Sequence, residues 1–450
     1  MLSRAPSTPS RTTMTPQSHQ RRDDLTFRGN LRSTRHGWLR LTPAYSVHLV
    51  SEILETAGVD RSMVVLDPFC GTGTTALVCA ERGIAAVTTD INPFLVWLAR
   101  AKGRTYSTTE LQAVRRHAPA VRRAIQARST TEPWCPPLHQ IEKWWDRETL
   151  LALARAMAEI RRLAGRRPRP EVDLLDLAFC RTMIERANVS FAHQSMSFKH
   201  APRTDPPVGR ARRARPRGSA SASPLLGSAR SAGVCARETV ARHWDEAVCA
   251  IAEAARSPIR VEPEVVLCDA RELGARLGVA RFELVITSPP YPNRMSYIRE
   301  LRPYMYWLGH LRERHDAGEL DWQSIGGTWG AATVRVGKWR PPVSAAAIPR
   351  DLVRILARIA ERSPLLSRYV EKYFHDMAQH CRSLYEVVRP GGSIHYIVGN
   401  SKFYDVLLPV ERLFAALFEA AGFEDASVQT LRKRTSKKEL FEFLVTARRP

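Results

Sequence analysis

Residues 63–102, MVVLDPFCGTGTTALVCAERGIAAVTTDINPFLVWLARAK, contain two successive strand–turn–helix units and decide the fold. The first unit is an apolar strand, MVVLD, followed by a turn with two glycines and an apolar helix. The second unit repeats this order with the strand IAAVTTD and the helix PFLVWLARAK. Short apolar strands that alternate with helices are typical of a parallel sheet with helices packed on its faces. This stretch therefore predicts an α/β fold.

The same strand and helix signals return after residue 260. They indicate strands within 261–273, 281–291 and 393–400, helices over 369–388 and 410–422, and a terminal hairpin that ends in ELFEFLVTARR. Because the last two strands are joined by a short turn, they are expected to pair antiparallel. We therefore predict a mostly parallel sheet with a terminal antiparallel hairpin.

Two long interruptions divide the predicted core. In the first, helical periodicity occurs at 147–165, 171–189 and 236–256, whereas 203–233 is rich in Arg, Pro, Gly, Ser and Ala and predicts a flexible basic loop. The predicted organisation is a disordered basic tail (1–36), core segments (37–102, 261–309 and 366–450), a helical insertion that is a candidate target-recognition region (103–260), and a second, irregular insertion that is a candidate DNA contact (310–365).

The amino-acid composition limits which binding partners and which cellular compartment are expected for this protein. The chain has 68 Lys and Arg against 45 Asp and Glu, a net charge of +23, which favours a polyanionic partner such as nucleic acid. No apolar run approaches the roughly 20 residues of a membrane span, and no secretory signal is evident. Eight scattered cysteines form no CxxC pair, so no metal is expected. These features predict a cytoplasmic protein without a membrane partner.

Three acids fall at the carboxyl ends of predicted strands. They are Asp67, Asp90 and Asp269, and Gly71 and Gly73 follow the first of them. Each acid alone could be a helix N-cap, but together they favour a nucleoside-type cofactor at the ligand-binding edge of the sheet. The glycine turn lacks the third glycine of a dinucleotide-binding fingerprint and the lysine of a phosphate-binding loop.

The strand FELVIT is followed by SPPY, residues 288–291. Two consecutive prolines cannot continue a ladder, and they stiffen the loop while removing N–H donors. A Pro-Pro turn with a surface tyrosine is the structural alternative. We interpret the loop as part of a pocket for a flat base that carries an amine.

Together, DPFCGTGTT, DINP and TSPPY closely resemble the S-adenosylmethionine-dependent DNA amino-methyltransferases, which modify N4 of cytosine or N6 of adenine. The resemblance implies a Rossmann-like class I methyltransferase sheet and S-adenosylmethionine as cofactor. It assigns the ribose to Asp90 and the adenine amino group to Asp269, and it places TPAYSVHLV (42–50) over the methionine part. The cofactor-binding residues that it implies are Asp67, Phe69, Gly71, Thr72, Gly73, Asp90, Asn92 and Asp269.

The same resemblance implies that the catalytic residues are Ser288, Pro289, Pro290 and Tyr291. The Ser288 hydroxyl and the Pro289 carbonyl would accept hydrogen bonds from the target amine, and Tyr291 would stack on the flipped base. Serine at the first position favours cytosine N4 over adenine N6. Double-stranded DNA is the implied partner, and a separately encoded cognate restriction endonuclease is left open.

Several stretches are candidate DNA contacts, each with an alternative structural role. They are NVSFAHQSMSFKH (188–200, with His193, Gln194, Ser195 and Lys199), WGAATVRVGKW (329–339, with Arg335 and Lys338), RARRARPRG (210–218) and LRKRTSKKE (431–439). Two other functions stay open. One is an RNA amino-methyltransferase, although the N/D-PPYG signature of that family is absent, and the other is a non-catalytic DNA-binding protein on a methyltransferase fold.

Overall fold

The computed structural model describes residues 27–30, 34–41, 44–128, 132–165, 169–190, 197–199, 226–293, 295–342, 348–434 and 439–450. A seven-stranded sheet with the order β10-β11-β7-β6-β1-β2-β5 forms its centre. Its strands are β1 (Val64–Asp67), β2 (Ala85–Asp90), β5 (Glu264–Leu267), β6 (Phe282–Thr287), β7 (Val388–Gly399), β10 (Glu424–Lys433) and β11 (Phe441–Arg448).

Strand directions in this sheet agree with the prediction. The neighbours β5, β2, β1, β6 and β7 all pair in parallel, while β11 runs antiparallel to β7 and β10 antiparallel to β11. The α/β fold class, with a mostly parallel sheet, a terminal antiparallel hairpin and a helical insertion, is therefore confirmed.

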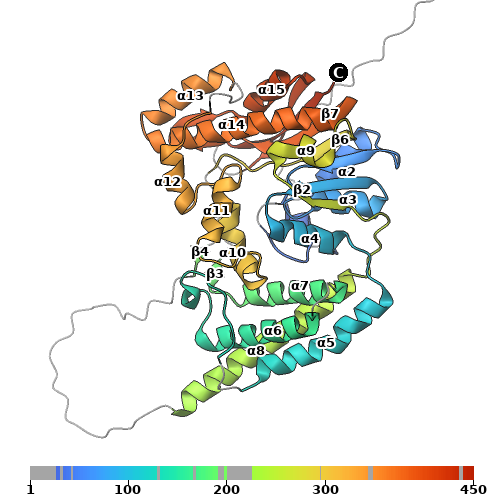
Figure 1. Cartoon of the computed structure of the whole chain (residues 1–450), viewed down its shortest axis with the longest axis vertical. Helices are drawn as coiled ribbons and strands as arrows, with labels where there is room; N and C mark the ends of the chain where they lie inside the picture. Colours follow the sequence, from blue (N-terminus) through green and yellow to red (C-terminus); the bar gives the residue numbers. More distant parts are fainter. Residues whose placement is uncertain are drawn as a thin grey trace, which may run out of the picture.

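Helices cover both faces of the sheet (Figure 1). One face carries α2 (Val47–Thr56), α3 (Thr74–Arg82) and α4 (Pro93–Gly103), and the other carries α9 (Leu273–Leu277), α14 (Pro364–Val387) and α15 (Val410–Ala421). In β1, Val65 packs into the first layer and Leu66 into the second, as alternation along a strand requires. Because both faces are buried, these strands are almost continuously apolar in sequence.

The first insertion folds as a helical bundle below the sheet (Figure 1). It consists of α5 (Thr108–Gln126), α6 (Arg147–Ala164), α7 (Pro170–Glu185) and α8 (Leu226–Ala254). Helix α10 (Tyr297–Trp307), which begins six residues after Tyr291, packs against this bundle. The Trp307 ring stands edge-on to Phe179 of α7 at 5.3 Å between ring centroids. The SPPY loop is thus connected directly to the core of the insertion.

The prediction that 310–365 is irregular is wrong. This segment contains α11 (Asp316–Gln323), α12 (Ala331–Lys338) and α13 (Arg350–Ala360). In α13 the buried side chains are Leu352, Leu356 and Ile359, a spacing of four and three residues that indicates an amphipathic helix. The remaining short elements are α1 (Phe27–Asn30), Ile141–Lys143, β3 (Val189–Ser190), β4 (Ser197–Phe198), Ala270–Glu272, β8 (Ser401–Phe403) and β9 (Val406–Leu408).

Two predicted boundaries also require correction. The predicted tail extends to residue 36, but Arg35 is only 1% exposed and its guanidinium donates to the carbonyls of Lys102 (2.9 Å) and Ala255 (2.6 Å). Those carbonyls lie at the ends of α4 and α8, where helices leave acceptors without partners. The predicted loop 203–233 is helical from Leu226, where α8 begins. Residues 1–26 and 203–225 lie outside the described residues.

Across the part of the chain that the structure describes, no helix combines the length and the apolar character needed to cross a membrane.

Candidate active site

The chain reverses direction across the sheet between β1 and β6. From β1 it moves outward through β2 to β5, and it then returns to place β6 and β7 on the other side of β1. In open parallel sheets, ligands bind at such a reversal, beyond the carboxyl ends of the strands. A cavity of about 270 Å³ lies there. Its walls come from the ends of β1 and β2, the loop after β6, Asp321 with residues 323–327, and the terminal hairpin.

Nine of the predicted site residues meet at this cavity. They are Phe69, Gly71, Asp90, Asn92, Asp269, Ser288, Pro289, Pro290 and Tyr291. The other three, Asp67, Thr72 and Gly73, are not part of its lining.

The turn between β1 and α3 brings backbone to the cavity wall. Gly71 and Gly73 have φ angles of 51° and 78°, a left-handed conformation that favours glycine. The Gly71 N–H donates to Oδ2 of Asp90 at 3.2 Å, which ties the turn to the end of β2. Behind the wall, the Thr72 carbonyl accepts a hydrogen bond from Nζ of Lys102 at 3.0 Å, and burial lowers the pKa of Lys102 to about 8.

Asp90 and Asn92 both line the cavity at the end of β2. Oδ1 of Asp90 accepts from the Asn92 N–H at 2.9 Å, and burial raises the pKa of Asp90 to about 6. Asn92 caps α4, because its Oδ1 accepts from the Phe94 N–H at 3.0 Å. Its Nδ2 is buried and has no hydrogen-bond partner among the described residues. A buried amide without an acceptor is costly, so this pair is suited to a ligand with hydroxyl or carbonyl groups.

Asp67 lies outside the cavity lining and joins the ends of β1 and β6 to the loop before α2. Its Oδ1 accepts from the Thr287 hydroxyl at 2.6 Å and from the Phe69 N–H at 3.1 Å, and its Oδ2 accepts from the Tyr45 hydroxyl at 2.9 Å. Burial raises the pKa of Asp67 to about 7. Asp67 therefore holds in place Tyr45 and the Phe69 backbone, and both of these residues line the cavity.

Phe69 is supported from behind by a histidine whose protonation is fixed by its partners. The Phe69 and His380 rings meet edge to face, with 4.8 Å between centroids. Nδ1 of His380 lies 2.7 Å from the Ala270 carbonyl and must carry the proton, while Nε2 accepts from the Tyr396 hydroxyl at 2.6 Å. Burial lowers the pKa of His380 to about 4, so the ring is neutral at physiological pH.

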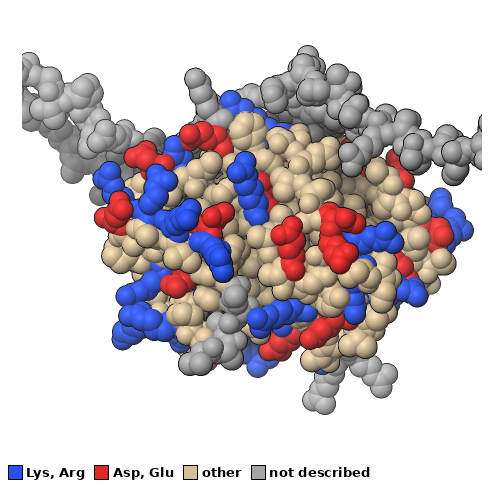
Figure 2. All heavy atoms as spheres, turned by 90° about the horizontal axis from the view of Figure 1, so that it is seen from above, with Lys and Arg blue, Asp and Glu red and all other residues tan. Residues whose placement is uncertain are grey.

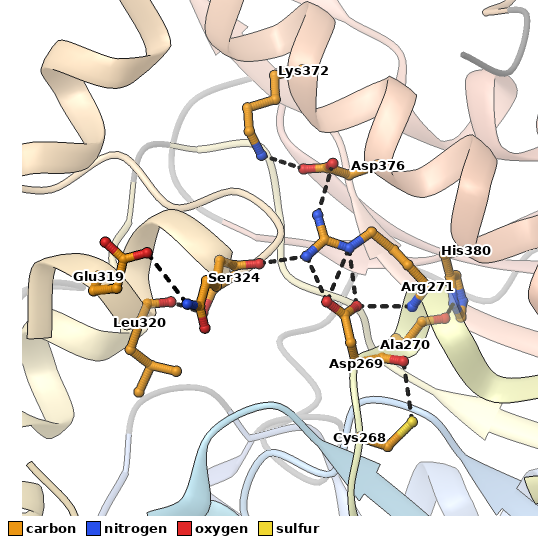
Figure 3. Close-up of polar contacts among 11 residues, drawn as sticks. Cys268, Asp269, Ala270, Arg271, Glu319, Leu320, Ser324, Lys372, Asp376 and His380 are labelled. Atoms are coloured by element: carbon orange, nitrogen blue, oxygen red, sulfur yellow. Dashed lines mark hydrogen bonds and ion pairs between the residues drawn. The ribbon is translucent and has the colours of Figure 1, made fainter. Parts of the chain in front are cut away.

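Asp269 reaches the cavity with its carboxylate already paired (Figure 3). Arg271 donates to it from Nη2 at 2.6 Å and from Nε at 3.0 Å. The same guanidinium binds Asp376 of α14 at 2.9 Å, and Asp376 in turn accepts from Lys372 at 2.6 Å. Nη2 of Arg271 also donates to the Gln323 carbonyl at 2.7 Å. This network attaches the second insertion to the predicted cofactor half of the site.

Ser288 and Pro289 of the SPPY loop line the cavity, and each carries an oxygen that can accept hydrogen bonds. The Ser288 hydroxyl donates to the Ile397 carbonyl of β7 at 3.0 Å. A hydroxyl has one proton and two lone pairs, so Ser288 can still accept hydrogen bonds. No described residue donates to the Pro289 carbonyl.

The second half of the loop is fixed by tyrosines. The Tyr373 hydroxyl of α14 donates to the Pro290 carbonyl at 2.7 Å. The Tyr291 hydroxyl donates to Oε1 of Glu442 at 3.1 Å. Burial, with Glu442 nearby, raises the pKa of Tyr291 well above its usual value, so this hydroxyl stays protonated and can donate.

Asp321 and residues 323–327 of the second insertion line the cavity, and none of them was a predicted cofactor or catalytic residue. Asp321 is buried and accepts hydrogen bonds from the Ser296 hydroxyl and from the Trp329 N–H at 2.7 Å. A Cβ at Gly327 would lie 1.6 Å from the Asp321 carbonyl oxygen, so only glycine fits this turn. The adjacent glycines Gly326 and Gly327 are the sequence feature that could have indicated this turn.

Arg432, Arg434 and Glu442 of the terminal hairpin also line the cavity. Arg432 and Arg434 belong to the candidate DNA-contact stretch 431–439, whereas Glu442 lies outside every predicted stretch. Arg432 and Glu442 face each other across the hairpin, with Nε of Arg432 2.7 Å from Oε2 of Glu442. The sequence did not predict that this hairpin and the SPPY loop share one cavity, because the two segments are far apart in the chain.

The candidate DNA contacts are only partly described. Lys199 and Lys338 are exposed, whereas Arg335 pairs with Glu319 at 2.6 Å. His193, Gln194, Ser195 and residues 210–218 lie outside the described residues. On the face seen in Figure 2, acidic and basic side chains are interspersed. This face therefore gives no evidence of a basic nucleic-acid surface.

Comparison with known proteins gives a short sequence match and structural matches of low similarity. Over 69 residues it is 33% identical to the Type II methyltransferase M.BsoBI of Geobacillus stearothermophilus, a match that covers 15% of this chain and 14% of that protein. The rRNA methyltransferase aviRa of Streptomyces viridochromogenes is 13% identical, with 94% of this chain and 96% of that chain covered and a TM-score of 0.29. A TM-score this low supports no conclusion. No protein-family model matches the chain.

Proposed function

We propose that this protein is a DNA methyltransferase that transfers a methyl group from S-adenosylmethionine to the exocyclic amine of a flipped-out base. The observation that carries the proposal is the shared cavity. The glycine turn with Asp90 and the SPPY loop open into the same space, so a methyl donor and an acceptor amine could meet there. The partial match to a type II methyltransferase supports the same activity.

The described residues fit S-adenosylmethionine. Asp90 would accept hydrogen bonds from the ribose hydroxyls, and the unpartnered Nδ2 of Asn92 offers a donor beside it. Phe69 and Tyr45 would enclose the methionine part, with Asp67 holding both from behind. When bound, the cofactor supplies an electrophilic methyl group on a sulfonium. The protein's contribution is to bind and orient it.

The SPPY loop would prepare the amine for attack. An exocyclic amine is a poor nucleophile because its lone pair is delocalised into the ring. If the Ser288 hydroxyl and the Pro289 carbonyl accept hydrogen bonds from the two N–H groups of the amine, the nitrogen lone pair is directed toward the methyl group. The Tyr291 ring would replace the stacking that the base loses when it leaves the duplex.

Cytosine N4 is the favoured target because Ser288 stands at the first position of the loop, and adenine N6 is the second choice. Double-stranded DNA is the proposed partner, consistent with the net charge of +23. A separately encoded restriction endonuclease would place the protein in a restriction-modification pair.

The test is expression in a host whose DNA carries no methylation, followed by nucleoside mass spectrometry and long-read sequencing. N4-methylcytosine in one sequence context is expected, and it should be lost in an Asp90→Ala variant. N6-methyladenine would keep the mechanism and overturn the choice of base. Unmodified DNA from a host that makes folded, cofactor-binding protein would contradict a DNA substrate and favour RNA.

A further inference from the structure

We propose that Arg434 binds a backbone phosphate of the nucleic-acid substrate, and that the terminal hairpin is therefore part of the substrate site. This inference rests on the proposed function and deepens it, because it assigns a substrate contact to a region outside the SPPY and cofactor motifs.

The charges in the cavity wall single out Arg434. The charged side chains that line the cavity are Asp90, Asp269, Asp321, Glu442, Arg432 and Arg434. Arg432 is neutralised by Glu442 across the hairpin. Arg434, in contrast, forms no ion pair with any acid in the described ranges. Among the charged residues that line the cavity, Arg434 is therefore the cation that is available to bind an anion.

Neutral groups hold the Arg434 guanidinium in one orientation. Nη1 donates to the Asn400 carbonyl at 2.9 Å, and the guanidinium carbon lies 5.0 Å from the centroid of the Tyr291 ring. A cation at this distance from an aromatic face is attracted by the ring. Neither partner is an acid, so the positive charge is oriented but not neutralised. A planar guanidinium in this state is well suited to a phosphate.

The end of β7 leaves space for this arrangement. A Cβ at Gly399 would lie 2.5 Å from Nη1 of Arg434 and 2.9 Å from Cε2 of Tyr291. Real Cβ atoms essentially never come so close to other atoms, so a larger residue at 399 would displace the guanidinium, the ring or both. The glycine therefore permits the stacked pair.

The position of Tyr291 favours a phosphate over other anions. If a flipped base stacks on this ring, its own backbone phosphates follow within one nucleotide's length of the ring. The guanidinium lies against the same ring. Neutralisation of backbone phosphates by Arg and Lys is also the main source of affinity for nucleic acid.

The hairpin supplies a matched control. Lys433 is the last residue of β10 and lies next to Arg434 in the candidate stretch 431–439, but it is exposed and does not line the cavity. The phosphate contact is therefore assigned to Arg434 and not to Lys433. Successive residues of a strand point to opposite faces. Lys433→Ala therefore removes a positive charge from the same hairpin without altering the cavity.

The test compares wild type, Arg434→Ala, Arg434→Lys and Lys433→Ala with double-stranded genomic DNA from a methylation-free host. Duplex affinity is measured between about 50 and 200 mM salt, because each neutralised phosphate contributes about 0.9 to the slope of log K against log salt. For Arg434→Ala we expect about tenfold weaker duplex binding and a slope reduced by about 0.9. Arg434→Lys should retain the slope with intermediate affinity, and Lys433→Ala should leave both near wild type.

The outcomes separate this inference from the proposed function. S-adenosylmethionine affinity should be unchanged in all variants, which also shows that they are folded. An Arg434→Ala variant with a lower kcat but an unchanged salt slope would overturn the phosphate contact and leave Arg434 as a support for Tyr291. Wild-type protein that neither binds the cofactor nor methylates a nucleic acid would instead contradict the proposed function.

Discussion

The pH dependence of cofactor binding is the sharpest prediction from the geometry of Asp90. Its carboxylate lines the cavity, and burial raises its pKa to about 6. Only the ionised form can accept hydrogen bonds from both ribose hydroxyls. A group whose pKa is raised loses its charge as the pH falls through that value. Affinity for S-adenosylmethionine should therefore decrease below about pH 6.

The magnitude follows from the fraction of protein in the ionised form. The apparent Kd is multiplied by one plus ten to the power of the difference between pKa and pH. For a pKa of about 6 this factor is about 2 at pH 6 and about 11 at pH 5. Replacing the carboxylate removes a charge-assisted hydrogen bond worth about 1.5–3 kcal/mol, so Asp90→Asn should bind roughly tenfold to a hundredfold more weakly.

Isothermal titration of the purified protein between pH 5 and pH 8 measures this effect. Asp90→Asn is the matched control, because its affinity should be nearly independent of pH. Asp67, whose pKa burial raises to about 7, titrates in the same range but does not line the cavity, so the part of the pH dependence that Asp90→Asn removes is the part that belongs to Asp90. If wild type and Asp90→Asn show the same pH profile, Asp90 does not contact the cofactor as we describe.

Three substitutions test other parts of the site. Gly327→Ala forces a Cβ to within 1.6 Å of the Asp321 carbonyl oxygen. Calorimetry should then show weaker cofactor binding, and denaturant unfolding should show a free energy of unfolding lowered by about 1–3 kcal/mol. Unchanged values would mean that the turn is not constrained. Thr287→Val removes the hydroxyl that donates to buried Asp67, and the free energy of unfolding should fall by about 1–3 kcal/mol, an effect absent if the carboxyl finds another donor. Tyr291→Ala should weaken duplex binding by about 1–3 kcal/mol, whereas Tyr291→Phe keeps the ring and should bind nearly as wild type; equal losses in an affinity assay would contradict stacking.

Local sequence patterns predicted the sheet, and they predicted nine of the residues that line the candidate site. Gly71 and Asp90 are both close in sequence to the strands that carry them, so a strand followed by a glycine turn or an acid could be recognised from a few residues. The SPPY loop was equally local. These features follow from backbone geometry at the ends of strands, which the sequence encodes directly.

The remainder depends on contacts between distant residues. Arg35 was assigned to a disordered tail because its partners are backbone carbonyls more than 60 positions away, which no side-chain pattern reveals. Arg434 reaches Tyr291 only after the terminal hairpin joins the sheet beside β7. The turn at Gly327 lines the cavity together with Gln323, whose carbonyl accepts a hydrogen bond from the distant Arg271. Such contacts arise from tertiary packing.

Methyl transfer by the purified protein tests the central claim most directly. The protein is incubated with duplex DNA and S-adenosylmethionine that carries a deuterated methyl group, and the digested nucleosides are examined by mass spectrometry. We predict the labelled methyl on the exocyclic amine of one base, as N4-methylcytosine, with Ser288→Ala and Tyr291→Ala strongly reduced. Label on a ring carbon, or no label in DNA while the protein binds the cofactor, would contradict the account.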